Sequence, residues 1–139
     1  MIRALLSLNI LHVVVVSMAG FALGSVWYSP FLFAKAWLRE MRIDPADARA
    51  AGGGLTLLVS AFVLTLVSTA GLAALISVAG PRTAGAGARF GLLVGLLLVA
   101  ARQGVNGVFE RRSLRHFLIT AGHDVALCAL QGALLGAWA

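Results

Sequence analysis

Long runs of hydrophobic residues, separated by short polar stretches, divide the chain into four segments. A helix needs about 20 residues to cross a hydrocarbon core roughly 30 Å thick, and each run reaches that length. The runs extend over Leu5–Tyr28, Leu55–Ala79, Ala88–Val108 and Leu114–Trp138. Because lipid offers no hydrogen bonds to the backbone, such runs are predicted to be helices rather than strands. The pattern therefore predicts an all-α membrane protein, with one transmembrane domain over residues 1–139 built as a four-helix bundle.

The polar stretch after the first run repeats at helical spacing on two faces. Its apolar positions recur at i, i+3, i+4 and i+7, at Ala34, Trp37, Leu38 and Met41. Its basic positions recur on another face, at Lys35, Arg39 and Arg42. With Ser29 as N-cap and Pro30 in the first turn, the stretch predicts an interfacial amphipathic helix over about residues 30–42. Its apolar side would lie in the acyl boundary and its basic side toward headgroups. The alternative is an ordinary solvated helix of a soluble loop.

Small residues recur four positions apart within the runs, at Gly20 and Gly24, at Gly87, Gly91 and Gly95, and at Gly132 and Gly136. Ridges of this kind let helix backbones approach closely in lipid. They can pack the bundle internally or join two copies of the chain; packing within one chain is the expected role, and both can hold at once. The second run has only Ser and Thr as polar residues, and it is predicted to be a packing partner for the others.

The composition agrees with lipid as the main solvent. Hydrophobic residues make up 60% of the chain and charged residues 12%, against about half and about a quarter in soluble domains. The net charge is +6, but the basic residues lie between the apolar runs, where anionic headgroups are found. Membrane lipids are therefore the expected partners. Nucleic acid is not, since no aromatic-basic platform or reading motif is present. The single cysteine, Cys128, excludes quinone-linked enzymes that need paired cysteines.

The distribution of Lys and Arg predicts the orientation in the membrane. The first and third loops carry seven basic residues: Lys35, Arg39, Arg42, Arg49, Arg111, Arg112 and Arg115. The N-terminus and the second loop carry three: Arg3, Arg82 and Arg89. We therefore expect an integral protein of a bacterial inner membrane, with the first and third loops against anionic headgroups on the cytoplasmic side and both termini outside. Ser17-Met18-Ala19 imitates a signal-peptide cleavage site, but the apolar run continues to Trp27, so a retained helix is predicted.

Polar side chains inside a span are costly and by default mark a functional site. They occur at Asn9 and His12 in the first run, at Arg102, Gln103 and Asn106 in the third, and at His116, Thr120, His123, Asp124 and Gln131 in the fourth. Arg102, Asn106 and Glu110 have the i, i+4, i+8 spacing of one helical stripe. Arg102 can reach Asp124 if the third and fourth spans are antiparallel neighbours, which their short connection favours.

These polar residues have two interpretations. In the first they form a structural core that fixes the register of the helices. In the second they form a binding site, made of His123 and Asp124 with Arg102, Gln103, Asn106 and His12 in support. A His beside an Asp can change charge near neutral pH, so such a site could take a polar headgroup, an ion or a proton.

The chain has no metal-binding, phosphate-loop or nucleophile-elbow motif. We therefore expect it to bind or move a small ligand, ion or lipid rather than to catalyse a reaction, and no cofactor is indicated. The alternative is an accessory subunit of a larger membrane complex or of a homo-oligomer.

Two motifs resemble a known family. The first is Gly24-Ser25-Val26-Trp27-Tyr28-Ser29-Pro30-Phe31-Leu32-Phe33, followed by Lys35-Ala36-Trp37, and the second is Phe109-Glu110-Arg111-Arg112-Ser113. They are similar to the small membrane family catalogued as domain of unknown function 1761, which opens with a helix ending in Gly-x-x-Trp-Tyr-Ser-Pro, then Phe and Trp. The resemblance implies the same four-span layout and no known activity. The last span differs from that family, which tends to show Asn and then Tyr-His where this chain has Thr120, His123 and Asp124.

Aromatic and basic residues near the end of the first run are predicted to lie at the membrane interface: Trp27, Tyr28, Trp37, Lys35, Arg39 and Arg42. Trp and Tyr at the end of a span are typical of an aromatic belt at headgroup level. Phe31 and Phe33 follow closely, and with Trp37 they are candidates for an aromatic wall against a lipid tail or a pigment.

Overall fold

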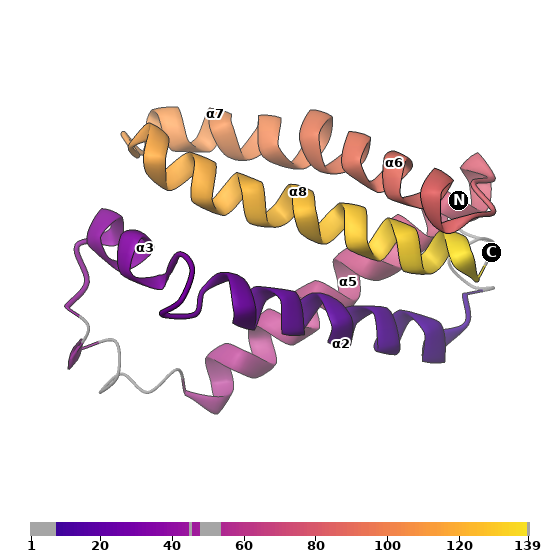
Figure 1. Cartoon of the computed structure of the whole chain (residues 1–139), viewed down its shortest axis with the longest axis horizontal. Coiled ribbons are helices and arrows are strands. Elements are labelled where there is room, and N and C mark those ends of the chain that lie inside the picture. The colour runs from indigo at the N-terminus through magenta and orange to yellow at the C-terminus, as the bar shows by residue number, and fades with distance from the viewer. Residues whose placement is uncertain (1–7, 45, 48–53, 139) are drawn as a thin grey trace.

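The computed structural model describes residues 8–44, 46–47 and 54–138, and every regular element in these ranges is a helix (Figure 1). The elements are α2 (Ile10–Trp27), α3 (Ala34–Met41), α5 (Leu55–Ala79), α6 (Ala84–Val94), η1 (Gly95–Ala100), α7 (Ala101–Phe109) and α8 (Leu114–Ala137). The segment η1 is a π-helix that joins α6 to α7 without a break. Within the described ranges four helices are long and apolar enough to cross a membrane, the third being the continuous Ala84–Phe109. The predicted all-α class and the four spans are confirmed.

Polar side chains set where three of the spans begin. Asn9 precedes α2, and its side-chain oxygen accepts hydrogen bonds from the backbone N–H groups of Leu11 and His12 at 3.0 and 3.4 Å. The hydroxyls of Thr83 and Ser113 cap α6 and α8 in the same manner, which satisfies N–H groups that have no partner within the helix. Asn9 is thus a helix cap rather than a polar residue within the span. The first three residues of the predicted run lie outside the described ranges.

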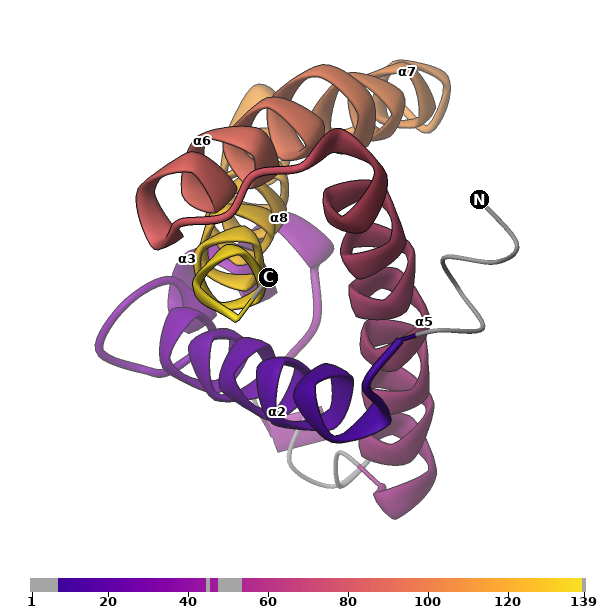
Figure 2. The same cartoon turned by 90° about the vertical axis from the view of Figure 1, so that its right-hand side faces the viewer.

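The four spans alternate in direction along the bundle. The helix made of α6, η1 and α7 runs beside α8, and α2 packs against another side of α8 (Figure 1). Seen along the bundle, α5 lies beside α2, and it also contacts α8 (Figure 2). The short helix α3 and the turn between α7 and α8 lie at one end, which we call the α3 end, and the C-terminus lies at the other (Figure 1).

The tightest contact in the bundle joins the backbones of α6 and α8. A Cβ atom added at Gly87 would lie 2.0 Å from the carbonyl oxygen of Gly132, and one added at Gly91 would lie 2.0 Å from that of Cys128. On α8, a Cβ atom at Gly132 would lie 2.3 Å from the Gly87 carbonyl oxygen. These distances leave no room for a side chain, so the predicted glycine ridges pack helices within one chain.

The buried apolar core lies where α2, α5 and α8 meet. It is formed by Val13, Val16, Leu72, Ala73, Ile76 and Leu135. Elsewhere large apolar side chains point outward: Leu64, Leu97 and Val108 are 68%, 63% and 76% exposed. Apolar surface on this scale is unfavourable in water, and it suits a bundle whose outer face is solvated by lipid.

The polar stretch after α2 forms a helix later than predicted. Helix α3 begins at Ala34, and the residues before it make turns in which the carbonyl oxygen of Ser29 accepts from the N–H groups of Leu32 and Ala34 at 3.1 and 3.2 Å. Ser29 is therefore not the N-cap; Phe33 holds that position without a side-chain cap. These turns lead the chain from the end of α2 to α3, which contacts α8, and the helix starts where the turns end. Its placement at a membrane surface remains a prediction.

The α6–α8 contact predicts a sharp difference between two glycines. Gly91→Ala should lower the free energy of unfolding in detergent by about 1–3 kcal/mol, because the helices must separate to admit the Cβ atom. Gly71→Ala is the matched control, since an added Cβ at Gly71 has nothing within 4 Å, and it should be neutral or stabilising because Ala favours a helix. Equal stability of the two variants would contradict the described packing.

Candidate functional site

A carboxylate, a histidine and an amide meet between α7 and α8. The Nδ1 atom of His123 lies 2.8 Å from Oδ1 of Asp124, and Nε2 of Gln103 donates to Oδ2 of Asp124 at 3.3 Å. All three side chains are partly buried. We call these three residues the carboxylate cluster. His123 and Asp124, the pair predicted from the sequence, are therefore joined by a hydrogen bond. Gln103, in the third span, donates a second hydrogen bond to the same carboxylate.

The end of α2 encloses the imidazole of His123. The Tyr28 ring lies 5.2 Å from it and the Trp27 ring 6.0 Å, measured between ring centroids. Trp27 is held in place because its indole N–H donates to the carbonyl oxygen of Ile119 at 3.1 Å. At Gly24 an added Cβ would lie 3.3 Å from Nε2 of His123. The Gly-x-x-Trp-Tyr sequence is thus the wall against which His123 packs.

The aromatic residues of the following turn and of α3 form a second layer around this wall. Phe33 packs on Trp27 with 4.9 Å between ring centroids, and Trp37 packs edge-on against Tyr28 at 5.8 Å. Phe31 is 95% exposed and takes no part. Of the three residues considered for an aromatic wall, two therefore support the ring pair that surrounds His123.

The carboxylate cluster contains more hydrogen-bond acceptors than donors. With Asp124 ionised, Nδ1 of His123 carries the proton of their hydrogen bond, so Nε2 of the neutral ring is an acceptor. Nε2 of His123 and Oε1 of Gln103 are both buried, and neither has a hydrogen-bond partner among the described residues. Buried polar atoms are nearly always paired. The cluster is therefore short of a positively charged or hydrogen-bond-donating group.

Arg102 does not supply that group. Its side chain is exposed, and within the described residues Asp124 forms no ion pair with it. The reason is the π-helix η1. In an uninterrupted α-helix seven residues make about two turns, so Arg102 would share the face of Gly95, which packs on α8. The wide turns of a π-helix take up about one extra residue, and Gln103 occupies that face instead. The predicted Arg102–Asp124 pair is wrong for this reason.

The predicted stripe after Arg102 is displaced in the same way. Asn106 and Glu110 are exposed rather than directed at Asp124. Both line a cavity of about 210 Å³ between α7 and α8, which also includes His116, Thr120 and Gln103. The cavity extends from the α3 end of the bundle to the amide of Gln103. Asn106 is thus outside the carboxylate cluster but on the approach to it.

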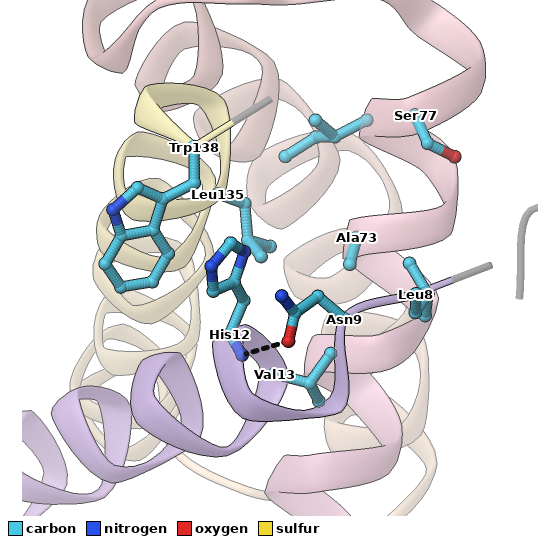
Figure 3. A pocket seen from close by; sticks show the side chains of 9 residues that line it. Leu8, Asn9, His12, Val13, Ala73, Ser77, Leu135 and Trp138 are labelled. Atoms are coloured by element: carbon cyan, nitrogen blue, oxygen red, sulfur yellow. Dashed lines mark hydrogen bonds between the residues drawn. The ribbon is translucent and has the colours of Figure 1, made fainter.

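His12 belongs to a different part of the molecule. It lies twelve positions before Gly24, about 18 Å along α2. Its ring stacks against Trp138 with 4.7 Å between centroids, and it lines a cavity of about 250 Å³ together with Asn9 and Ser77 (Figure 3). His12 and the carboxylate cluster do not form one site.

A second polar contact, between α2, α5 and α8, was not predicted from the sequence. The Thr69 hydroxyl oxygen lies 2.9 Å from that of Ser17 and accepts from Nε2 of Gln131 at 2.8 Å. The three residues are 0%, 0% and 1% exposed. The predicted packing partner α5 therefore also contributes a hydrogen bond to the interior. The signal available in the sequence was Gln131 in the last span, because an amide within a span must find a hydrogen-bond partner.

Four apolar helices around an interior polar cluster define a small integral membrane protein of the four-helix-bundle class. The chain belongs to the family described as protein of unknown function (DUF1761), whose profile matches residues 11–136 and so includes all four spans. Comparisons with curated proteins and with solved structures gave no significant match.

The role of η1 can be tested by a spin-label scan. In a Cys128→Ala background, a nitroxide attached at Arg102→Cys should collide freely with dissolved oxygen, which concentrates in lipid, whereas one at Gln103→Cys should be protected by α8. The pattern follows from the rotation that η1 introduces. The reverse order of the two accessibilities would mean that the third span is a regular α-helix throughout.

Proposed function

We propose that this membrane protein binds a small cation at the carboxylate cluster. The observation that carries the proposal is the unmet demand for positive charge at Asp124. A carboxylate within a span is costly unless a counter-charge compensates it. Its partners are an imidazole and an amide, which are neutral donors unless His123 is protonated. A bound cation would remove this deficit.

The chemistry of the cluster limits the cation to two kinds. Carboxylate and amide oxygens are ligands for a small hard cation, and Gln103 offers an unpartnered oxygen beside Asp124. Alternatively a proton can bind at Nε2 of His123. The resulting imidazolium would lie beside the carboxylate and near the rings of Tyr28 and Trp27, within the roughly 6 Å over which an aromatic ring attracts a cation. A small hard cation and a proton would both supply positive charge, and experiment can distinguish between them.

The proposed route to the cluster begins at the α3 end. The cavity of about 210 Å³ has Glu110 and Arg112 at this end and Thr120 and Gln103 further in. His116 lies between them and can carry a proton. Further along α8, the fully buried contact of Ser17, Thr69 and Gln131 fills the interior. This arrangement favours exchange of the cation with one side of the membrane.

The same end is proposed to face the cytoplasm. Basic residues of the first and third loops line one cleft there, Arg39 and Arg42 from the first loop and Arg111 and Arg112 from the third. Ser113 also donates to the carboxylate of Glu40 between the two loops. Positive residues are retained on the cytoplasmic side of bacterial inner membranes. Helix α3 would then lie along the cytoplasmic surface, with Lys35 and Arg39 toward the headgroups.

Cation binding can be measured through stability. The protein is melted in detergent with N-methyl-D-glucamine as the only cation, and Na⁺, K⁺ or NH₄⁺ is then exchanged for it at constant ionic strength and at several pH values. A cation at 100 times its dissociation constant should stabilise the wild type by about 2.7 kcal/mol. Asp124→Asn should abolish the response, whereas Asp47→Asn, which removes an exposed carboxylate outside the spans, should retain it.

The outcomes separate the two kinds of cation. A response to Na⁺, K⁺ or NH₄⁺ that needs Asp124 identifies a bound ion. A response to pH alone that needs Asp124 identifies the proton. If the wild type and Asp124→Asn respond alike to every cation and to pH, the proposed function is wrong.

The orientation has its own test in single-cysteine variants of Cys128→Ala. In intact cells or spheroplasts, Arg82→Cys should react with a membrane-impermeant maleimide, whereas Arg39→Cys and Arg112→Cys should react only after permeabilisation. Labelling of position 39 or 112 from outside would reverse the proposed orientation.

A further inference from the structure

A strongly basic cleft lies at the α3 end, apart from the carboxylate cluster. It has a volume of about 440 Å³ and is bounded by the end of α3 on one side and by the turn between α7 and α8 on the other. Four arginines line it, two from each side: Arg39, Arg42, Arg111 and Arg112. With only Glu40 and Glu110 against them, the lining carries a net charge of +2. We call it the arginine cleft.

The two sides of the arginine cleft are fixed to each other. The Ser113 hydroxyl donates to the Glu40 carboxylate across the cleft, and Nη1 of Arg112 lies 3.2 Å from Sδ of Met41. Glu110 is engaged on its own side, because its carboxylate accepts from Nε of Arg112 at 3.1 Å. Glu40 thus joins the two walls and Glu110 pairs within one of them, and Arg39, Arg42 and Arg111 form no ion pair within the described residues.

Two of the arginines have an unusual backbone conformation. Arg42 has φ 56° and Arg111 has φ 54°, and they are the only described residues other than glycine with positive φ. Each follows the end of a helix, α3 and α7 respectively, where this left-handed conformation is normally given to glycine or asparagine because other side chains are disfavoured in it. Residues kept in disfavoured conformations cluster at functional sites. The arginine side chain, rather than the turn, is therefore the feature to be explained.

The negative end of a helix offers a simpler explanation for basic residues at these positions. A cation in the last turn complements the helix dipole, which accounts for Arg39. It does not account for arginine at the left-handed position, since glycine would form the turn without strain. It also does not account for two such arginines from distant parts of the sequence that line one cleft.

We propose that the arginine cleft binds a phosphate monoester group. Guanidinium groups form paired hydrogen bonds with phosphate oxygens, and a phosphate monoester carries about −1.5 to −2 charges at neutral pH. Such a group matches the net charge of the lining, whereas a phosphodiester or a carboxylate carries one charge. The cleft adjoins the ends of the third and fourth spans, at the level of lipid headgroups. The ligand is therefore either the headgroup of a monoester lipid or inorganic phosphate.

The experiment compares lipid retention in the full-length protein. Protein from nanodiscs containing phosphatidylcholine with equal amounts of phosphatidic acid and phosphatidylglycerol is analysed by native mass spectrometry. The wild type should retain phosphatidic acid about tenfold better than phosphatidylglycerol, the difference expected from one extra charge-assisted hydrogen bond. The double variant Arg42→Gly, Arg111→Gly should lose this preference.

Two further variants separate binding from folding and from net charge. Because glycine relieves the left-handed strain, Arg42→Gly, Arg111→Gly should melt at the same or a higher temperature than the wild type while it loses the preference. Arg82→Gln, Arg89→Gln removes the same charge at the opposite end and should keep it. Arg42→Lys, Arg111→Lys keeps the charge but not the paired hydrogen bonds, and the preference should fall toward that of the glycine variant.

The source of the phosphate is decided by adding inorganic phosphate. If phosphate at millimolar concentration displaces phosphatidic acid, or stabilises the detergent-solubilised wild type but not the glycine variant, the cleft takes free phosphate. If it does neither while the lipid preference holds, the ligand is the headgroup. Equal retention of the two lipids by the wild type without a stabilising effect of phosphate, or a preference that survives in the glycine variant, would overturn the proposal. Neither Arg42 nor Arg111 lines the cavity that leads to Gln103. The effect of the glycine variant on lipid retention is therefore independent of cation binding at the carboxylate cluster.

Discussion

The rest of the bundle depends on the backbone contact between α6 and α8. Without side chains at Gly87, Gly91 and Gly132, the two helices touch along their main chains, and in lipid, where no hydrophobic force drives helices together, such packing is a main source of affinity. A contact this close also permits only one register. The π-helix η1 continues the same span and sets which face of α7 is presented to α8. Gln103 therefore reaches Asp124 because of an interaction that begins four turns earlier.

The sequence was sufficient for the four spans and their order, since hydropathy and length leave few alternatives in lipid. It was not sufficient for the rotation of the third span. Residues 95–100 are small or apolar and give no sign of a π-helix, so extrapolation of α-helical spacing placed Arg102 where Gln103 lies. Helix α2 also begins later than the hydrophobic run predicts, because the run does not show that Asn9 is a cap.

The separation of residues along the sequence explains which parts of the site could be predicted. His123 and Asp124 adjoin in the sequence, so their pairing was within reach. Trp27 and Tyr28 fit a membrane belt when considered alone, and only the antiparallel packing of α2 against α8 brings them to His123. The Ser17–Thr69 contact was hidden for a different reason. A serine or threonine in a helix can satisfy its hydroxyl on its own backbone, so nothing in the sequence requires a partner on another span.

The central place of α8 has a consequence for the assembly of the protein during synthesis. Among the described helices α8 is the last to be made, yet it contacts α2, α3, α5, α6 and α7. Until it is inserted, Gly87 and Gly91 have no backbone to pack against, and Thr69 lacks the amide of Gln131. The earlier spans can enter the membrane one by one, but they can only complete their packing together, when the final helix arrives. A ribosome stalled before α8 would leave three inserted helices with their interior surfaces open to lipid and to membrane proteases.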